Sequence, residues 1–334
     1  MNVKTLFFCC ILTFSGFNVF SQCCAGGSGS PIAGGASQGV LQQNQFDINV
    51  NFQHINTSKF LTGHSPAKNT ENFFKSYQSN YIYNRVGYGI TKDFTMYVET
   101  GYFLNKSETG FVKERTYKSK GIGDLILFPR YDIINKTKKN KRTELTLGLG
   151  LKIPLGKYND SNKEVEPFSG EAYYITKPLA VQPSTGAHDI IFYSFFLKDL
   201  SKFKVFSNVL YIKKGWNPLG EKVGDFFSVG LFASKTFFKT LGVTVQVRGE
   251  WIDKMKLNNS IYLFDPPNYD PAATGSKKVF FVPQLSYTYQ RKITFYALTE
   301  IPVYQYVTKT QVASQYQANI GVSYRFMVQK ASDK

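Results

Sequence analysis

Segments in which polar and apolar residues alternate recur along this chain, and the connections between them alternate between short and long. The links at Lys92, 199–201, 238–239 and Arg291 are tight, and the link at 135–141 is only moderately longer. Polar stretches separate the other segments, at 57–75, 106–119, 155–186, 215–223, 253–277 and 305–313. Transmembrane β-barrels sort their connections in this way, because turns on one side are short and loops on the other side are long.

The pattern inside the segments predicts strands with one apolar face and one polar face. In the last segment Tyr316, Ala318, Ile320, Val322, Tyr324 and Phe326 alternate with Gln317, Asn319, Gly321, Ser323 and Arg325. The stretches 46–53 and 145–153 repeat this pattern. Alternation with a period of two suits a strand that faces lipid on one side and water on the other. Segments 187–198 and 202–214 carry aromatic residues on both faces, so their register stays open.

The composition is compatible with a barrel and offers no membrane helix. Aromatic residues make up 16% of the chain, and after residue 20 no apolar run approaches the ~18–20 residues that a membrane helix needs. We therefore predict an all-β fold, a transmembrane antiparallel up-and-down β-barrel of about 12 strands over 41–326, with a polar tail at 327–334. Both termini are expected in the periplasm and the long loops outside. The twelve predicted strands lie near 41–56, 76–91, 93–105, 120–134, 142–154, 187–198, 202–214, 224–236, 240–252, 278–290, 292–304 and 314–326.

The N-terminus reads as an export signal. Lys4 precedes an apolar stretch at 6–20, so we predict a signal peptide over 1–21 and a location in the outer membrane of a Gram-negative bacterium. A flexible Gly/Ser-rich periplasmic segment at 22–40 follows and contains Cys23 and Cys24. Three interpretations of this pair stay open: a lipid anchor on Cys23, a soft-metal site made by both thiols, or a tail whose cysteines pair or have no role.

The formal net charge of +17 lies largely in connections. The basic residues of two of them are Lys113, Arg115, Lys118, Lys120, Lys136, Lys138, Lys139, Lys141 and Arg142. No nucleic-acid-binding motif accompanies these charges, and export argues against such a partner. Two interpretations stay open: attraction to outer-membrane lipid head groups and lipopolysaccharide phosphates, or a solvated loop without a partner.

Charged residues on the predicted inner faces are the candidate functional residues. The lumen candidates are Glu99, Asp124, Arg130, Lys152, Arg248, Glu250, Glu300 and Arg325, with Asp47, Arg85 and Asp132 on the same faces. Charges of either sign are costly against lipid but tolerated inside a barrel, where they pair or stay hydrated. The set therefore predicts either a salt-bridged filling of the lumen or a selective path for small solutes.

Catalysis has little support in the sequence. Of the three histidines, only His54, with Asn56 and Ser58 nearby, loosely suggests an outer-membrane lipid hydrolase. His188 beside Asp189 is an equally weak candidate, and the spacing of His and carboxylates predicts no metal site. We expect no enzyme and no cofactor.

Four short motifs in order resemble one protein family. They are GIGDL at 121–125 leading to Arg130-Tyr131, LGLKIPLG at 149–156, QPSTGAHD at 182–189, and IPVYQ at 301–305 before the last segment. This arrangement over 75–326 is similar to the outer-membrane "transporter" family associated with the meta-pathway of phenol degradation. The resemblance implies a barrel whose cargo includes hydrophobic or aromatic compounds.

Three functional hypotheses follow. The first is passage of a small-molecule cargo, with Arg130, Lys152, Arg248, Glu99 and Glu300 as lumen gates. The second is a non-transporting surface or scaffold barrel that binds a partner through its long loops, and the third is a lipid hydrolase. The terminal aromatic Phe326 also predicts recognition by the barrel-assembly machinery.

Overall fold

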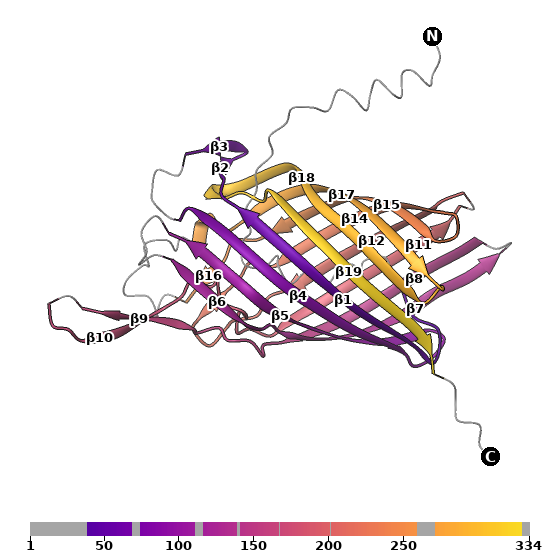
Figure 1. Cartoon of the computed structure of the whole chain (residues 1–334), viewed down its shortest axis with the longest axis horizontal. Helices are drawn as coiled ribbons and strands as arrows, with labels where there is room; N and C mark the ends of the chain where they lie inside the picture. The colour runs from indigo at the N-terminus through magenta and orange to yellow at the C-terminus, as the bar shows by residue number, and fades with distance from the viewer. Residues whose placement is uncertain are drawn as a thin grey trace, which may run out of the picture.

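A closed antiparallel β-barrel forms the body of the chain (Figure 1). The computed structural model describes residues 39–68, 74–110, 116–138, 141–166, 168–200, 202–258 and 271–328. Within these ranges the twelve barrel strands are β1 (Gln45–Thr57), β4 (Ser76–Gly89), β5 (Phe94–Thr109), β7 (Leu125–Lys138), β8 (Lys141–Ile153), β11 (Asp189–Asp199), β12 (Lys204–Lys213), β14 (Phe226–Phe237), β15 (Leu241–Ile252), β17 (Ser276–Tyr289), β18 (Ile293–Val312) and β19 (Tyr316–Met327). The predicted fold class is confirmed.

The first and last strands close the ring. β1 pairs with β19 in one continuous register that runs from Gln45 opposite Met327 to Asn56 opposite Tyr316. Every other barrel strand pairs with its sequence neighbours, as an up-and-down barrel requires. Because the sheet closes, none of the twelve strands is left as an open edge.

Two of the tight links are three-residue hairpin connections, 238–240 between β14 and β15 and 290–292 between β17 and β18. Their first two residues have positive φ, 51° and 61° at Phe238 and Lys239, and 49° and 56° at Gln290 and Arg291. Two successive residues in the left-handed region are the mark of a type I′ turn, whose twist matches that of the strands it joins. These turns lie at the end of the barrel where β1 begins and β19 ends, hereafter the short-turn end.

Several strands run further than predicted. β7 extends to Lys138 and β8 begins at Lys141, so Lys136 and Lys141 lie in strands and not in the predicted link at 135–141. β18 likewise continues through the predicted link to Val312. At these places polar residues follow one another, so the alternation that marks a strand in the sequence fades while the backbone ladder continues.

The segment predicted at 120–134 is broken in two. β6 (Tyr117–Ile122) pairs with the outer part of β5, and β7 begins only at Leu125. Gly121 has a φ of 147°, which a residue with a side chain rarely adopts. Glycine therefore lets the chain bend between the two strands.

Short elements decorate the opposite, long-loop end (Figure 1). They are β2 (Phe60–Gly63), β3 (Ser65–Ala67), β6, β9 (Ser161–Val165), β10 (Ala172–Thr176), β13 (Glu221–Lys222), β16 (Lys256–Leu257) and the 3-10 helix η2 (Pro271–Ala273). β9 and β10 form a separate hairpin, and β13 pairs with β16. Within the described ranges no helical segment has the length and hydropathy needed to span a membrane.

Candidate functional site in the barrel lumen

Alternation along each strand sends one face outward and the other into the lumen. On β1, Asp47, Asn49 and Asn51 are buried inside, whereas Ile48 and Val50 are exposed on the outside. The two segments of open register are now assigned. Tyr193 and Phe195 of β11 face inward, and Phe192 faces outward. The inward residues of a barrel line its interior, so they define the candidate site.

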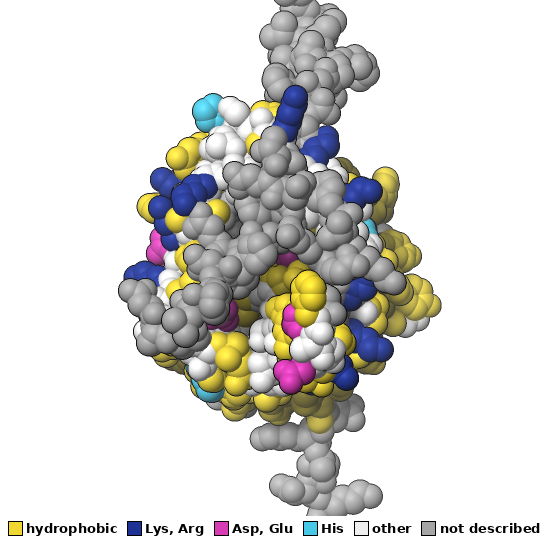
Figure 2. Space-filling model, turned by 90° about the vertical axis from the view of Figure 1, so that its left-hand side faces the viewer, with side chains coloured by type: hydrophobic (Ala, Val, Ile, Leu, Met, Phe, Trp, Pro, Cys, Tyr) yellow, Lys and Arg dark blue, Asp and Glu magenta, His cyan; other side chains and the backbone are white. Residues whose placement is uncertain are grey.

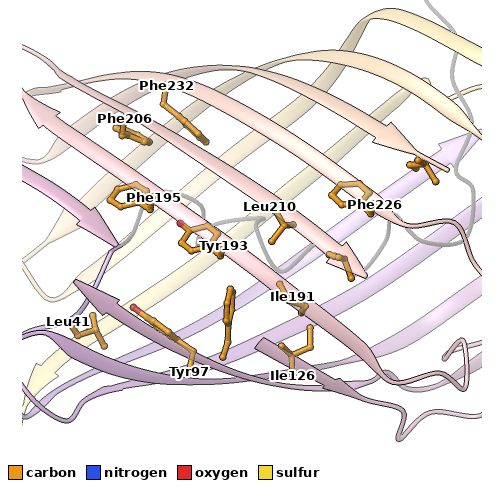
Figure 3. Close-up of a cluster of buried hydrophobic side chains, with 13 residues drawn as sticks. Leu41, Tyr97, Ile126, Ile191, Tyr193, Phe195, Phe206, Leu210, Phe226 and Phe232 are labelled. Atoms are coloured by element: carbon orange, nitrogen blue, oxygen red, sulfur yellow. The ribbon is translucent and has the colours of Figure 1, made fainter. Parts of the chain in front are cut away.

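One wall of the lumen is apolar. Its side chains form a single buried cluster that comes from β5, β7, β11, β12, β14 and β15, with Leu41 added from the chain before β1 (Figure 3). The members are Leu41, Tyr97, Ile126, Phe128, Ile191, Tyr193, Phe195, Phe206, Leu210, Ile212, Phe226, Phe232 and Ile252. Aromatic contacts run through it, for example Phe206 on Phe232 with centroids 4.6 Å apart. The residues predicted to line the lumen were chosen for their charge, so they do not include this wall. The aromatic residues on both faces of 187–214 were the sign of it in the sequence.

The opposite wall is largely polar, although Phe280, Val282, Tyr296 and Leu298 of β17 and β18 form a small buried apolar cluster beside it. β1, β4, β18 and β19 supply its buried hydrogen-bonding groups, which are Asp47, Asn49, Asn51, Gln53, Ser79, Arg85, Glu300, Gln305, Asn319 and Ser323. Both the amide oxygen and the amide nitrogen of Asn319 lack a hydrogen-bond partner within the described ranges. Buried amides normally find a partner, so such atoms are suited to contact with water or a polar solute.

A three-strand charge cluster lies at the closing seam. The Asp47 carboxylate of β1 accepts hydrogen bonds from Arg85 Nη2 of β4 at 2.8 Å and from Arg325 Nε of β19 at 3.0 Å. Ser323 Oγ donates to the same carboxylate at 2.6 Å. The side chains of Asp47 and Arg85 are 0% exposed, whereas that of Arg325 is 39% exposed. The candidate Arg325 therefore reaches toward the short-turn mouth and neutralises Asp47 together with Arg85.

A second cluster joins β15 to β18. Arg248 Nη1 and Nη2 donate to the two carboxylate oxygens of Glu300 at 3.0 and 2.6 Å, and Nη2 also lies 2.9 Å from Glu250 Oε1. The guanidinium stacks 5.0 Å from the ring centroid of Phe280. A bidentate pair of this kind fixes both side chains, so three predicted lumen residues are brought together in one rigid group.

A third cluster lies near the long-loop end. Lys152 Nζ is 2.5 Å from Asp124 Oδ2 and 3.3 Å from Asp189 Oδ2. Lys214 Nζ is 3.0 Å from the same Asp189 oxygen. The predicted residues Lys152 and Asp124 therefore meet, and Asp189, considered in the sequence only beside His188, serves instead to anchor two lysines.

Arg130 is held by aromatic rings. Its guanidinium carbon lies 4.5 Å from the ring centroids of Tyr97 and Tyr193 and 4.6 Å from that of Phe128. Cation–π contacts of this kind are strongest where water is excluded, and Arg130 is 2% exposed. The predicted residue Glu99 is fully buried on the neighbouring strand β5, where it faces the Tyr83 hydroxyl of β4.

Residues 39–42, the N-terminal segment, cross the short-turn mouth. The backbone N–H of Leu41 donates to Thr95 Oγ1 at 2.8 Å, and the Tyr97 hydroxyl donates to the carbonyl oxygen of Gly39 at 3.4 Å. The Leu41 side chain is buried in the apolar wall. No periodic signal marks this segment, so the sequence did not predict that it folds back into the lumen.

Residues 177–187, the inner loop, narrow the long-loop end. Val181 is 0% exposed, and Lys106 Nζ of β5 donates to the carbonyl oxygen of Gln182 at 2.7 Å. Lys177 Nζ lies 2.6 Å from Asp160 Oδ2, to which Ser119 Oγ also donates at 3.2 Å. Burial pushes the pKa of Asp160 upward, but the hydrogen bonds from Lys177 and Ser119 and the Lys177 charge outweigh it and hold the pKa below its ordinary value.

His54 and Ser58, the residues named for the hydrolase hypothesis, do not contact one another as in a catalytic triad. His54 Nδ1 lies 2.7 Å from Asn80 Oδ1, and Ser58 instead bonds to the Gln315 amide oxygen. No hydrogen bond between a histidine and a serine occurs among the described residues. The predicted signal peptide, Cys23, Cys24, Lys113, Arg115 and Lys139 lie outside the described residues.

The fold has a counterpart among solved structures. The COG4313 outer membrane channel from Pseudomonas putida F1 superposes with a TM-score of 0.60 at 11% identity, covering 86% of this chain and 97% of that chain. This is an outer-membrane barrel fold. The translocator domain of the autotransporter NalP from Neisseria meningitidis (TM-score 0.46, 11% identity, 89% of this chain and 92% of that chain) is less similar. The P. putida toluene transporter TodX (TM-score 0.40, 9% identity, 87% and 92%) is less similar still.

No protein-family model matches the chain, and no curated protein matches it either. Because the identity is only 11%, the similarity to the channel from P. putida F1 shows the fold alone. The expected resemblance therefore holds at the level of an outer-membrane barrel fold, and membership of the phenol-pathway transporter family stays a prediction.

Proposed function

We propose that this protein is an outer-membrane channel that passes small, largely apolar molecules along the apolar wall of its lumen. The observation that carries the proposal is the contiguous inward cluster of aromatic and aliphatic side chains from six strands. Lumens that pass polar solutes are lined by polar groups, whereas an apolar wall lowers the free energy of a hydrophobic solute that leaves water. Binding sites for such solutes are mostly apolar with a few placed polar groups.

The polar wall and the charge clusters fit the same proposal. They hold nearby strands of the wall at fixed distances, as the Arg248–Glu300 pair does between β15 and β18, which lie on either side of β17. A solute in the lumen then contacts rings on one side and amides or charges on the other. The preferred cargo is therefore an apolar molecule with a small polar group. The outer membrane of a Gram-negative bacterium is the proposed location.

Reconstitution into liposomes tests the proposal. Influx of a hydrophobic aromatic probe is compared with influx of a neutral sugar for the wild type, Phe195→Ser and Phe192→Ser. Both residues are on β11, but Phe195 faces the lumen and Phe192 the outside, so the pair separates the lumen from the strand itself. We expect Phe195→Ser to slow the aromatic probe about tenfold, which corresponds to about 1.4 kcal/mol, about half the value of burying one Phe side chain.

Leu210→Met provides a variant of similar volume on the same wall, which should fold and retain influx. If the wild type admits the sugar as fast as the aromatic probe, the proposed preference is wrong. If it admits neither, and planar bilayers record no conductance for the wild type or for charge reversals at Arg130 and Glu300, transport itself is wrong.

A second candidate function rests on the β9–β10 hairpin. All side chains of β10 are exposed, among them Tyr174, and Phe168 in the connection is exposed as well. An exposed aromatic hairpin at the long-loop end would suit a surface barrel that binds a partner. Replacing 161–176 by a short Gly/Ser link should then abolish partner binding and leave influx unchanged.

A further inference from the structure

A cleft on the outside of the barrel lies at the long-loop end. Its volume is about 370 Å³, and its floor is formed by the ends of β15, β17 and β18. Trp251, Lys277 and Tyr306 are direct neighbours across these three strands, in the pairs Trp251–Lys277 and Lys277–Tyr306. All three side chains are exposed on the outer face. The cleft therefore opens on the outer face, and Ile252 of the apolar wall reaches it from the inner side.

The cleft is strongly basic. Lys254 and Lys256, from the connection that follows β15, line it together with Lys277, and among the described residues Asp253 is the one acidic residue of its lining. The three lysines are exposed, and none has a carboxylate ion-pair partner among the described residues. Lys277 Nζ lies 4.7 Å from the ring centroid of Trp251. Three cations against one anion leave an excess of positive charge beside an aromatic pair.

The position of the cleft selects the class of ligand. Below Trp251, Lys277 and Tyr306 the same strands present outward apolar side chains, including Val247, Phe281 and Val303. In outer-membrane barrels a belt of aromatic residues marks the level at which the hydrocarbon layer meets the head groups. Figure 2 views the long-loop end and shows Lys and Arg side chains around its rim, with hydrophobic side chains on the outer edge.

We propose that this cleft binds the phosphate of a phosphorylated outer-leaflet glycolipid of the lipid A type. The ammonium groups of Lys254, Lys256 and Lys277 contact the phosphate, the indole and phenol rings contact the sugar, and the acyl chains lie along the apolar outer wall. Basic residues near a membrane surface attract anionic head groups with about 1 kcal/mol each, or about fivefold in affinity. The proposal concerns the outside of the barrel and does not depend on transport.

Binding is tested on the purified, folded full-length protein in a zwitterionic detergent. Bisphosphorylated lipid A, its dephosphorylated form and inorganic phosphate are titrated against it, and binding is followed by native mass spectrometry. Trp251 fluorescence in a Trp216→Phe background gives a second readout. We expect lipid A to bind and the other two probes to bind at least about tenfold more weakly.

The key variant replaces Lys254, Lys256 and Lys277 by Gln and should weaken lipid A binding about 100-fold. Its matched control is Lys235→Gln. Lys235 also lies over an aromatic ring, 4.9 Å from the centroid of Phe237, but at the short-turn end. This control should bind lipid A within about twofold of the wild type.

Three results would overturn the proposal. If the triple variant binds lipid A with wild-type affinity, the three lysines take no part in binding. If dephosphorylated lipid A binds equally well, the phosphate is not recognised. Equal binding of inorganic phosphate would show an anion site that does not recognise a lipid. The lysines are exposed, so the triple variant should fold, and its circular dichroism spectrum and its resistance to unfolding in detergent check that it does.

Discussion

Asp47→Asn should destabilise the closed barrel more than any comparable change at its surface. The Asp47 carboxylate neutralises Arg85, and neither side chain is exposed, so the substitution leaves a guanidinium in the interior without its carboxylate. Breaking a buried pair in this way costs about 3–5 kcal/mol. Because Asn still accepts a hydrogen bond and Arg85 keeps its contact with the Tyr97 ring, we expect about 3 kcal/mol, the lower end of that range.

Urea unfolding in lipid vesicles measures this loss. The chain has two tryptophans, Trp216 and Trp251, each 51% exposed, whose fluorescence reports the transition. With a slope of about 3 kcal/mol/M, a loss of about 3 kcal/mol lowers the midpoint by about 1 M. Arg325→Gln removes the other cation of the cluster, but this side chain is 39% exposed, so its loss should cost less than about 1 kcal/mol. If the two variants lose equal stability, the distinction between the buried and the exposed partner is wrong.

Acidification should release the β9–β10 hairpin. The folded contacts of Asp160 lower its pKa, so their contribution is complete above the ordinary carboxyl pKa of about 3.9 and is lost as the pH falls through the lower folded value. The rate of pepsin cleavage within 161–176, divided at each pH by the rate for Asp160→Asn, should rise for the wild type as the pH falls from about 5 to about 2. Leu41→Asp should free the N-terminal segment, because a carboxylate is costly in the apolar wall, and single-channel conductance should increase. Gly89→Val should increase the conductance too, because a Cβ at this position collides with the carbonyl oxygen of Gln42 and displaces the N-terminal segment. Unchanged conductance in both variants would contradict the inference that this segment obstructs the short-turn mouth.

The alternation of polar and apolar residues was sufficient to predict the barrel. A period of two assigns each residue to a face without knowledge of its neighbours, which is why Asp47, Arg248 and Glu300 were all placed inside correctly. The same rule could not assign the faces of β11, because this strand carries aromatic residues on both of them, Phe192 on one and Tyr193 and Phe195 on the other. An apolar lumen wall removes the contrast on which the prediction depends.

Contacts between inward residues of different strands were beyond sequence reasoning for another reason. Which inward residue meets which depends on the stagger of strands around the ring, and a shift of two residues would give Arg248 another partner. The pair of Arg248 with Glu300 joins residues 52 positions apart, and no local pattern encodes that separation. The N-terminal segment has no periodicity at all, so its entry into the lumen had no sequence signal.

The pairing of β1 with β19 also bears on how the barrel assembles. Asp47 and Arg325 are 278 positions apart, so their contact forms only after nearly the whole chain has been made. Non-local contacts of this kind are slow to form, because the entropy of closing the loop is lost before the contact is gained. Until then β1 and β18 present unpaired backbone edges, which readily join other chains. A nascent polypeptide would therefore need chaperones that shield both edges, and premature termination within the last hairpin should yield aggregates, not a smaller pore.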